Sequence, residues 1–199
     1  MQELKRLVGG PVSKGKGAVF LDRDGTICVL VEYMDDPDQV ELLPEAAEAI
    51  RTFNKLGMLV VMITNQSALA RGYFTEDVLG AIHERLNRIL EKEGAHIDAI
   101  YYCPHHPDDK CKCRKPEPGL LIKAAEELGI DLKRSFMVGD KVDDAAAGKA
   151  AGCKGILVLT GYGLGELALR DQWKVVPDHI ADDLLGAAEW IEKQLKKWP

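Results

Sequence analysis

The sequence lacks any long apolar run. No stretch approaches the roughly 20 apolar residues that would span a bilayer, and the first residues lack the apolar core of a secretory signal peptide. The chain also lacks an excess of positive charge, since its formal net charge is -6 at pH 7. A general nucleic-acid binder would usually be basic. These absences predict a cytoplasmic protein that binds neither membranes nor nucleic acid, and any anionic substrate must be held by a local cluster of cations.

The cysteine content argues against a disulfide framework. The five cysteines are an odd number, and three of them crowd into residues 103–113, which favours metal binding over disulfides. The length of 199 residues, with 46% hydrophobic and 29% charged residues, fits one domain with a substantial core. We expect a single domain over residues 18–199. Residues 1–17 end in GGPVSKGKG and are expected to form a flexible lead-in without regular structure.

Short apolar runs alternate with amphipathic segments throughout this domain. The runs predict strands at 18–22, 58–63, 98–102, 135–138 and 154–159. The amphipathic segments predict helices at 45–56, 76–93, 117–128, 142–151 and 182–197. This alternation is typical of βαβ units, so we expect a three-layer α/β/α sandwich around a Rossmann-like parallel sheet. Residues 160–180 suggest a loop and little more.

The sequence DRDGT follows the first predicted strand. It places two carboxylates, Asp22 and Asp24, at the carboxyl end of that strand, where open α/β sheets bind their ligands. Gly25 allows a sharp turn after them. One carboxylate can attack an electrophile while the second moves a proton. Taken alone, the motif favours a functional site, and an Asp-rich surface turn is the alternative.

Polar residues also follow two other predicted strands. Thr64 comes directly after the strand at 58–63, and its hydroxyl and nearby backbone N–H groups can grip a phosphate oxygen. Asp140 follows the strand at 135–138, and together with Asp22 it would make an oxygen-rich site suited to Mg²⁺. For the Thr64 segment considered alone, a plain polar loop is the favoured alternative.

Two cations precede a predicted helix farther along the chain. Arg114 and Lys115 come directly before Pro116, which fits the first turn of a helix starting at Glu117. A lysine can neutralise a phosphoryl group as a compact charge, while an arginine can clasp its oxygens in a planar fork. A solvated basic pair is the alternative.

The order of these motifs, DxDGT, a strand-end Thr, a Lys before a helix, and GDxxxD, resembles the haloacid dehalogenase superfamily over residues 18 to about 160. The resemblance implies that Asp22 is a nucleophile forming an aspartyl-phosphate, and that Asp24 is the general acid and then the base. It also implies that Thr64 and Lys115 bind the phosphoryl group. Mg²⁺ would be held by Asp22, Asp140 and the backbone carbonyl of Asp24. The second aspartate favours phosphoester cleavage over carbon–halogen chemistry.

Residues 103–113 offer three thiolates and two imidazoles. The set Cys103, His105, Cys111 and Cys113 predicts a closed, structural zinc site, because Cys₃His is a common tetrahedral ligand set. His106 is the alternative imidazole ligand. Free cysteines beside a polar loop are the alternative interpretation. A catalytic zinc is disfavoured, because four protein ligands would leave no coordination position open for substrate or water.

The zinc loop is directly followed by the two cations. Because Cys113 precedes Arg114 and Lys115, a zinc ion would pin the backbone that presents both of them. We therefore hypothesise that replacing Cys113 with serine releases zinc and weakens phosphate handling while leaving the strand-end aspartates intact.

The spacing between the motifs leaves no room for a cap domain. Only about 20 residues remain between Asp22 and Thr64 once a helix and a strand are subtracted, so the site should be open and served by loops 27–43 and 65–74 and by the zinc loop. Within the superfamily, a capless body with this zinc loop resembles the heptose bisphosphate and histidinol-phosphate phosphatases. The run TNQSALARGYFTE favours the heptose enzymes. By this resemblance, the substrate-binding residues are Arg23, Leu30, Val31, Glu32, Tyr33, Asn65, Gln66, Ser67, Arg114 and Lys141.

The resemblance thus implies a Mg²⁺-dependent phosphatase that releases the C7 phosphate of D-glycero-D-manno-heptose 1,7-bisphosphate, and we expect it to be a monomer. Histidinol phosphate or another small sugar phosphate is the alternative substrate. The alternative from another functional class is a non-catalytic zinc-bearing binding module. Cys28 lies near the nucleophile as a reactive thiol or as a buried filler. Arg71 is either a contact to the distal phosphate or a surface residue.

Overall fold

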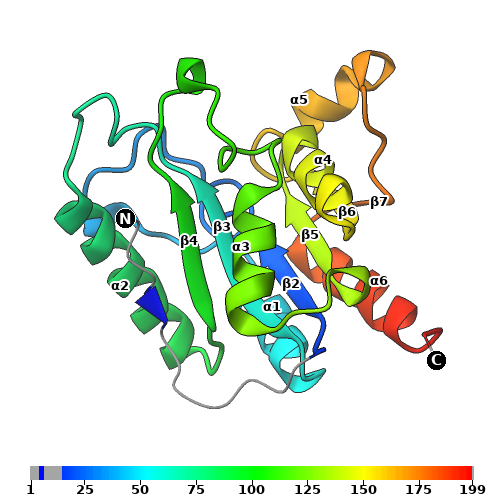
Figure 1. The fold of residues 1–199 in the computed structure, drawn as a ribbon. Coiled ribbons are helices and arrows are strands. Elements are labelled where there is room, and N and C mark those ends of the chain that lie inside the picture. Colours follow the sequence, from blue (N-terminus) through cyan, green and yellow to red (C-terminus); the bar gives the residue numbers. More distant parts are fainter. Residues whose placement is uncertain (1–4, 7–14, 199) are drawn as a thin grey trace.

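A seven-stranded sheet forms the centre of the protein in the computed structural model, which describes residues 5–6 and 15–198 (Figure 1). The strands are β1 (Lys5–Arg6), β2 (Ala18–Leu21), β3 (Leu59–Asn65), β4 (Ala99–Cys103), β5 (Phe136–Gly139), β6 (Lys154–Val158) and β7 (His179–Ala181). Their order across the sheet is β1-β4-β3-β2-β5-β6-β7. All neighbouring strands are parallel except β1, which runs antiparallel to β4.

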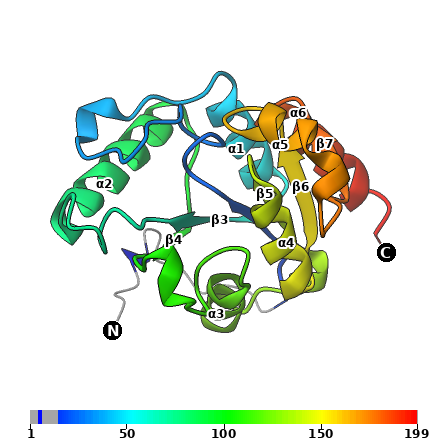
Figure 2. The same cartoon turned by 90° about the horizontal axis from the view of Figure 1, so that it is seen from above.

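Helices cover both faces of this sheet (Figure 2). They are α1 (Ala46–Lys55), α2 (Glu76–Lys92), α3 (Gly119–Leu128), α4 (Val142–Ala151), α5 (Gly163–Ala168) and α6 (Leu184–Leu195). Val19 and Leu21 of β2 pack with α1, α2 and α6, whereas Ala18 and Phe20 pack with α3 and α4. The alternation of side chains along a strand therefore divides the core into two halves. The predicted three-layer α/β/α sandwich is confirmed.

The central strands are apolar up to their carboxyl ends, where β3 carries Thr64 and Asn65, as parallel strands covered on both faces require. In β3 every residue before Asn65 is buried. Between β2 and β3 the chain forms a 3-10 turn at Pro37–Gln39 and helix α1, and no cap domain occurs in the described residues. None of the helices among those residues is long and apolar enough to cross a membrane.

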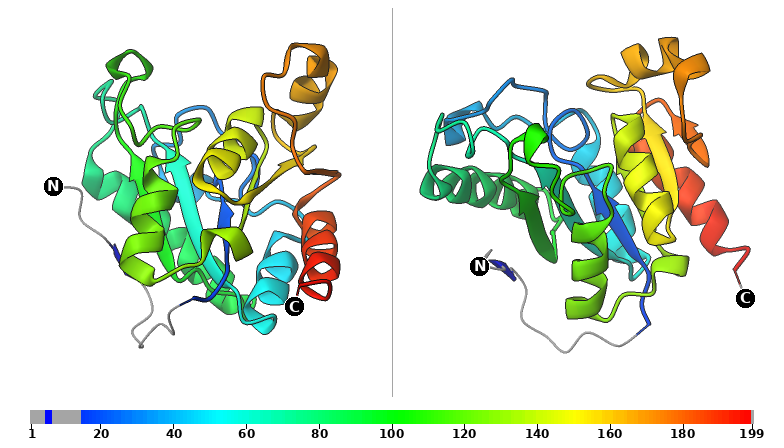
Figure 3. Two further views of the ribbon diagram at one scale, coloured as in Figure 1. Left: turned by 45° about the vertical axis from the view of Figure 1, so that its right-hand side comes forward. Right: turned by 45° about the horizontal axis from the view of Figure 1, so that its top comes forward.

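The structure differs from the sequence-based expectations at three places. Lys5–Arg6 pairs with β4, so this part of the expected lead-in is regular, while residues 1–4 and 7–14 lie outside the described residues. The helix expected from Glu117 begins at Gly119, with Pro118 at its N-cap. Residues 160–180, expected to be a loop, contain α5 and β7. Figure 3 shows α5, in orange, beyond the carboxyl ends of the strands.

Candidate active site

The carboxyl ends of β2, β3 and β5 meet at one edge of the sheet. The register pairs Leu21 of β2 with Met62 of β3 and with Val138 of β5. Residues that follow these strands therefore come together, as predicted for the strand-end motifs. They line an open pocket of about 770 Å³. The predicted site residues in its lining are Asp22, Arg23, Asp24, Leu30, Val31, Glu32, Tyr33, Thr64, Asn65, Gln66, Ser67, Arg114, Lys115, Asp140 and Lys141.

A buried cation joins two carboxylates at the floor of this pocket. Lys115 is 4% exposed, and its Nζ lies 2.8 Å from Asp22 Oδ1 and 2.6 Å from Asp144 Oδ1. The same Nζ donates a hydrogen bond of 2.8 Å to the carbonyl oxygen of Ile63 in β3. Although burial acts to lower the pKa of Lys115, the carboxylates of Asp144 and Asp22 raise it above its usual range. Lys115 therefore stays cationic beside the proposed nucleophile.

A third carboxylate, Asp140, is buried next to this pair. Burial, reinforced by the charge of Asp22, raises the pKa of Asp140 to about 7, against a lowering by the hydrogen bond from the backbone N–H of Tyr162. Gly25 and Gly161, both at positive φ, pack around its carboxylate, and a Cβ at either position would collide with Oδ2. The turn after Asp24 therefore requires glycine because the chain passes directly over Asp140.

The carboxylates of Asp22, Asp140 and Asp144 form a site that fits a divalent cation. One oxygen of each lies within 4.8 Å of the others. Asp140 Oδ1 is buried and has no hydrogen-bond partner among the described residues. Burial also raises the pKa of Asp144 to about 6, with Lys115 acting to lower it. Three crowded acidic groups with one lysine leave negative charge uncompensated, and hard oxygen ligands suit Mg²⁺.

Asp24, in contrast, turns its carboxylate toward protein donors. Arg23 donates from Nε to Oδ1 at 3.0 Å and from Nη2 to Oδ2 at 2.9 Å. Gln66 donates from Nε2 to Asp24 Oδ2 at 3.1 Å and to the buried Thr64 Oγ1 at 2.9 Å. The side chain of Asp24 is thus not part of the carboxylate cluster, which is compatible with the expected use of its backbone carbonyl toward Mg²⁺.

Asn65 contacts the backbone of the loop that carries the two cations. Its Oδ1 accepts from the N–H of Lys115 at 3.1 Å, and its Nδ2 donates to the carbonyl of the same residue at 3.2 Å. Strand β3 therefore holds Lys115 at both ends, through Asn65 at the backbone and through Ile63 at Nζ. The neighbouring Arg114 is partly buried, and its Nη1 has no hydrogen-bond partner within the described chain.

Asp144 and Tyr162 are among the pocket residues that are not in the set expected from the sequence. Asp144 belongs to the GDxxxD motif, but only the fold brings it to Lys115. Tyr162 lies in the segment expected to be a loop, and the Nζ of Lys141 lies 4.2 Å from the centre of its ring. The motif spacing was a signal for Asp144, whereas nothing in the sequence pointed to Tyr162.

The two open questions on Cys28 and Arg71 receive structural answers. Cys28 is fully buried in the core, and burial raises the pKa of its thiol to about 12, which fits a filler. Arg71 is exposed and lies 5.9 Å from the ring centre of Tyr33, which also packs edge-on against Tyr73. Arg71 is not part of the pocket lining.

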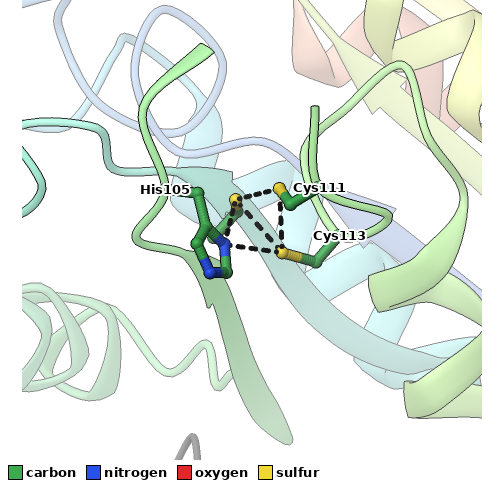
Figure 4. A group of neighbouring side chains, drawn as sticks. His105, Cys111 and Cys113 are labelled. Atoms are coloured by element: carbon green, nitrogen blue, oxygen red, sulfur yellow. Dashed lines mark hydrogen bonds between the residues drawn. The ribbon is translucent and has the colours of Figure 1, made fainter. Parts of the chain in front are cut away.

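The expected zinc ligands converge where the end of β4 meets the loop before α3, and Figure 4 shows His105, Cys111 and Cys113 of this cluster. Cys113 Sγ lies 3.2 Å from Cys103 Sγ, 3.3 Å from Cys111 Sγ and 3.2 Å from His105 Nδ1. Zinc–sulfur bonds of about 2.3 Å give tetrahedron edges of about 3.8 Å, so the cluster is slightly tighter than a loaded site. His106 instead caps a 3-10 turn, its Nδ1 accepting from a backbone N–H at 3.3 Å. This arrangement favours His105 over His106 as the ligand.

Comparisons with known proteins place this fold and site in a class. Residues 112–187 match the HAD-hydrolase-like family model. A D-glycero-beta-D-manno-heptose-1,7-bisphosphate 7-phosphatase of Pasteurella multocida (strain Pm70) is 44% identical over 174 residues, which are 84% of this chain and 94% of the relative. The enzyme of that name from Escherichia coli (strain K12) is 39% identical over 194 residues, 93% of this chain and 98% of the relative.

A solved structure agrees with these relatives. The D,D-heptose 1,7-bisphosphate phosphatase from B. bronchiseptica, crystallised with magnesium and phosphate, superposes with a TM-score of 0.83 at 38% identity. The superposition covers 89% of this chain and 99% of that one. The chain belongs to the haloacid dehalogenase superfamily of phosphoric monoester hydrolases, in the family of the heptose-1,7-bisphosphate 7-phosphatases.

Proposed function

We propose that this protein is a Mg²⁺-dependent phosphatase that releases the C7 phosphate of D-glycero-D-manno-heptose 1,7-bisphosphate. The observation that carries the proposal is the cluster of Asp22, Asp140 and Asp144 around the buried Lys115, at the floor of an open pocket. The names of the relatives support the substrate, and the family resemblance supports the covalent route.

In the first step, a carboxylate oxygen of Asp22 attacks phosphorus. The bond between phosphorus and the C7 oxygen of the sugar breaks, and its electron pair stays on that oxygen. The carboxyl group of Asp24 gives its proton to the departing alkoxide, which leaves as the sugar alcohol. Lys115 and the hydroxyl of Thr64 bind the oxygens of the transferring phosphoryl group, so the negative charge that develops there is offset.

In the second step, water attacks the aspartyl-phosphate of Asp22 at phosphorus. The carboxylate of Asp24 takes a proton from that water, and the acyl phosphate bond breaks with its electron pair returning to Asp22. Inorganic phosphate is released and both aspartates regain their starting states. The open pocket admits the water, which suits a hydrolase better than a phosphoryl-transfer mutase.

Two metal ions are part of this proposal. Mg²⁺, bound by Asp22, Asp140 and the backbone carbonyl of Asp24, supplies positive charge that relieves the repulsion between a carboxylate nucleophile and a phosphate dianion. The carboxylate of Asp144 supports that site through Lys115. Zinc, bound by the Cys₃His cluster, fixes the loop that carries Arg114 and Lys115.

Sugar recognition is assigned to the rim of the same pocket. Residues 30–33 and Ser67 line it from the loops after β2 and β3, and Arg114 and Lys141 add two cations. The Nη1 of Arg114 is buried without a hydrogen-bond partner among the described residues, and we assign it to a second phosphate on the substrate. A bisphosphate is therefore preferred over a monophosphate by local charge, despite the net charge of -6.

The test is a comparison of kcat/KM for phosphate release with and without Mg²⁺ on both anomers of the heptose bisphosphate, on histidinol phosphate and on simple sugar phosphates. We expect the heptose bisphosphate to be the best substrate, with phosphorus NMR showing loss from C7 only. Asp22→Asn should abolish turnover, whereas Asp171→Asn, which changes a fully exposed carboxylate, should not change it.

Two results would overturn this proposal. A higher kcat/KM for histidinol phosphate would reassign the substrate while keeping the chemistry. No Mg²⁺-dependent release of phosphate from any of these compounds would support a non-catalytic zinc-bearing module instead.

A further inference from the structure

Arg23 is the largest fully buried side chain of the described residues, and it lies beside the proposed reaction centre. It is 1% exposed, and its Nε and Nη2 each donate to a different oxygen of Asp24, at 3.0 Å and 2.9 Å. A planar guanidinium that donates two parallel hydrogen bonds fixes both the position and the plane of a carboxylate.

A second donor holds the same carboxylate. Gln66 is 5% exposed, and its Nε2 bonds Asp24 Oδ2 at 3.1 Å and Thr64 Oγ1 at 2.9 Å. Asp24 is therefore restrained from two directions by groups that are themselves packed in place. Such restraint matters because a displacement of about 1 Å in a reacting group can cost about 10²-fold in rate.

We propose that Arg23 is a positioning residue, which holds the carboxyl group of Asp24 in the orientation from which it exchanges a proton with the reacting oxygens. This inference rests on the proposed phosphatase function. It differs from the sequence-based expectation that Arg23 contacts substrate, because two of the three guanidinium nitrogens are engaged by Asp24. Gln66 takes part in the same restraint.

The loss of rate caused by misplacing Asp24 should depend on the leaving group of the substrate. A sugar alkoxide departs well only when a proton reaches it from Asp24 as its bond to phosphorus breaks. A p-nitrophenolate departs without that proton, because its negative charge is delocalised. Misplacing Asp24 should therefore slow the first step with a sugar phosphate and spare the first step with p-nitrophenyl phosphate. The value of kcat/KM reports only on the steps from substrate binding to departure of the first product, so hydrolysis of the aspartyl-phosphate does not affect it.

The experiment measures kcat/KM for both substrates in Arg23→Lys and Arg23→Gln. We expect a loss of about 10²-fold on the heptose bisphosphate, in the range typical of general acid catalysis, and a loss below about fivefold on p-nitrophenyl phosphate. Asp24→Asn should show the same selectivity, and Asp22→Asn should lose activity on both substrates. Arg88→Lys, at an exposed ion pair with Glu84, is the matched control and should change neither value.

Gln66→Met keeps the test decisive if both Arg23 variants fail to fold. It removes a neutral donor to Asp24 without unpairing a buried cation, and it should give the same selectivity at about a tenfold loss. Equal losses on the two substrates in folded variants would overturn the inference, as would a raised KM for the sugar phosphate with unchanged kcat. Absence of phosphate release from both substrates by the unmodified protein would overturn the proposed function, and the inference with it.

Discussion

At the scale of single residues, the site is held together by side chains that bind other parts of the protein. Asp22 and Asp144 share Lys115, Asp24 is held by Arg23, and Asn65 binds a backbone segment 50 positions away. The contacts of Lys115 and Asn65 cross between strand-end loops, whereas Arg23 and Asp24 are neighbours in one loop. The orientation of the reacting groups is therefore set by tertiary hydrogen bonds that form only once the sheet has brought these loops together.

The two hydrogen bonds from Asn65 to Lys115 make a first prediction. Asn65→Asp replaces the donor to the Lys115 carbonyl with a carboxylate oxygen, so the loop should shift. We expect kcat to fall about tenfold, the equivalent of about 1.4 kcal/mol and within the range for an unsatisfied buried group, with KM changed less than about threefold. Asn54→Asp is a matched control, because Asn54 makes the same pair of bonds to His96.

The control Asn54→Asp should lower the melting temperature and leave kcat and KM unchanged. A steady-state assay, with thermal melting of each variant, checks both statements. A raised KM in Asn65→Asp with unchanged kcat would contradict the positioning role and support the direct substrate contact that was expected from the sequence.

The raised pKa of Asp140 makes a second prediction, on the pH dependence of metal binding. Burial and Asp22 raise this pKa to about 7, so below that pH the carboxyl group is mostly protonated and a proton competes with Mg²⁺. Affinity should therefore rise with pH, by about tenfold between pH 6 and pH 8, with release of a proton on binding. The raised pKa of Asp144 acts in the same direction.

Isothermal titration with Mg²⁺ in buffers of different ionisation enthalpy measures both quantities. Asp140→Asn should abolish most of the pH dependence together with most of the affinity. Equal affinity at the two pH values in the unmodified protein would contradict the assignment of Asp140 as a ligand.

At the scale of elements, the zinc loop is a segment that metal binding, and not burial of apolar side chains, would stabilise. The segment from Cys103 to Cys113 connects β4 to the loop before α3 and is rich in polar residues, so it has little apolar surface of its own to bury. Two of its ligands, Cys111 and Cys113, pack at the edge of the core half that contains α3. A tetrahedral ion would fix this loop where the apolar core ends.

Thiol reactivity tests that site. Of the five cysteines, Cys28, Cys103 and Cys153 are buried, and burial raises the pKa of all three thiols, so they stay protonated and unreactive near pH 8 in the folded protein. We expect a thiol reagent to modify none of the five in the zinc-loaded native protein, the half-buried Cys111 and Cys113 after a chelator removes zinc, and all five after denaturation.

Cys113→Ser extends the same prediction. It should reduce the zinc content to near zero and lower phosphatase activity, and Cys153→Ser is the control that should retain both. Metal analysis and activity are measured on the same samples. A zinc-free variant with full activity would contradict the view that the ion positions the catalytic cations.

At the scale of the whole molecule, the sequence predicted the architecture and most of the pocket. Apolar runs bounded by turn residues located the central strands, and the parallel order then placed Asp22, Thr64 and Asp140 on one edge. The sequence did not predict that the side chain of Arg23 turns toward its neighbour Asp24, because packing sets the orientation of adjacent side chains. It also did not predict the position of Tyr162, which depends on packing between distant loops. Lys5–Arg6 was missed because two residues carry no periodic pattern, and α5 because its glycines favour a loop.

The central claim is that Asp22 carries the phosphoryl group between the two steps. Rapid acid quenching during turnover of a substrate labelled with ³²P in its C7 phosphate measures this most directly, followed by mapping of the labelled peptide. We predict transient label on the peptide containing Asp22 in the unmodified protein and none in Asp22→Asn. Release of phosphate at the full rate with no label on the protein at any quench time would contradict the account.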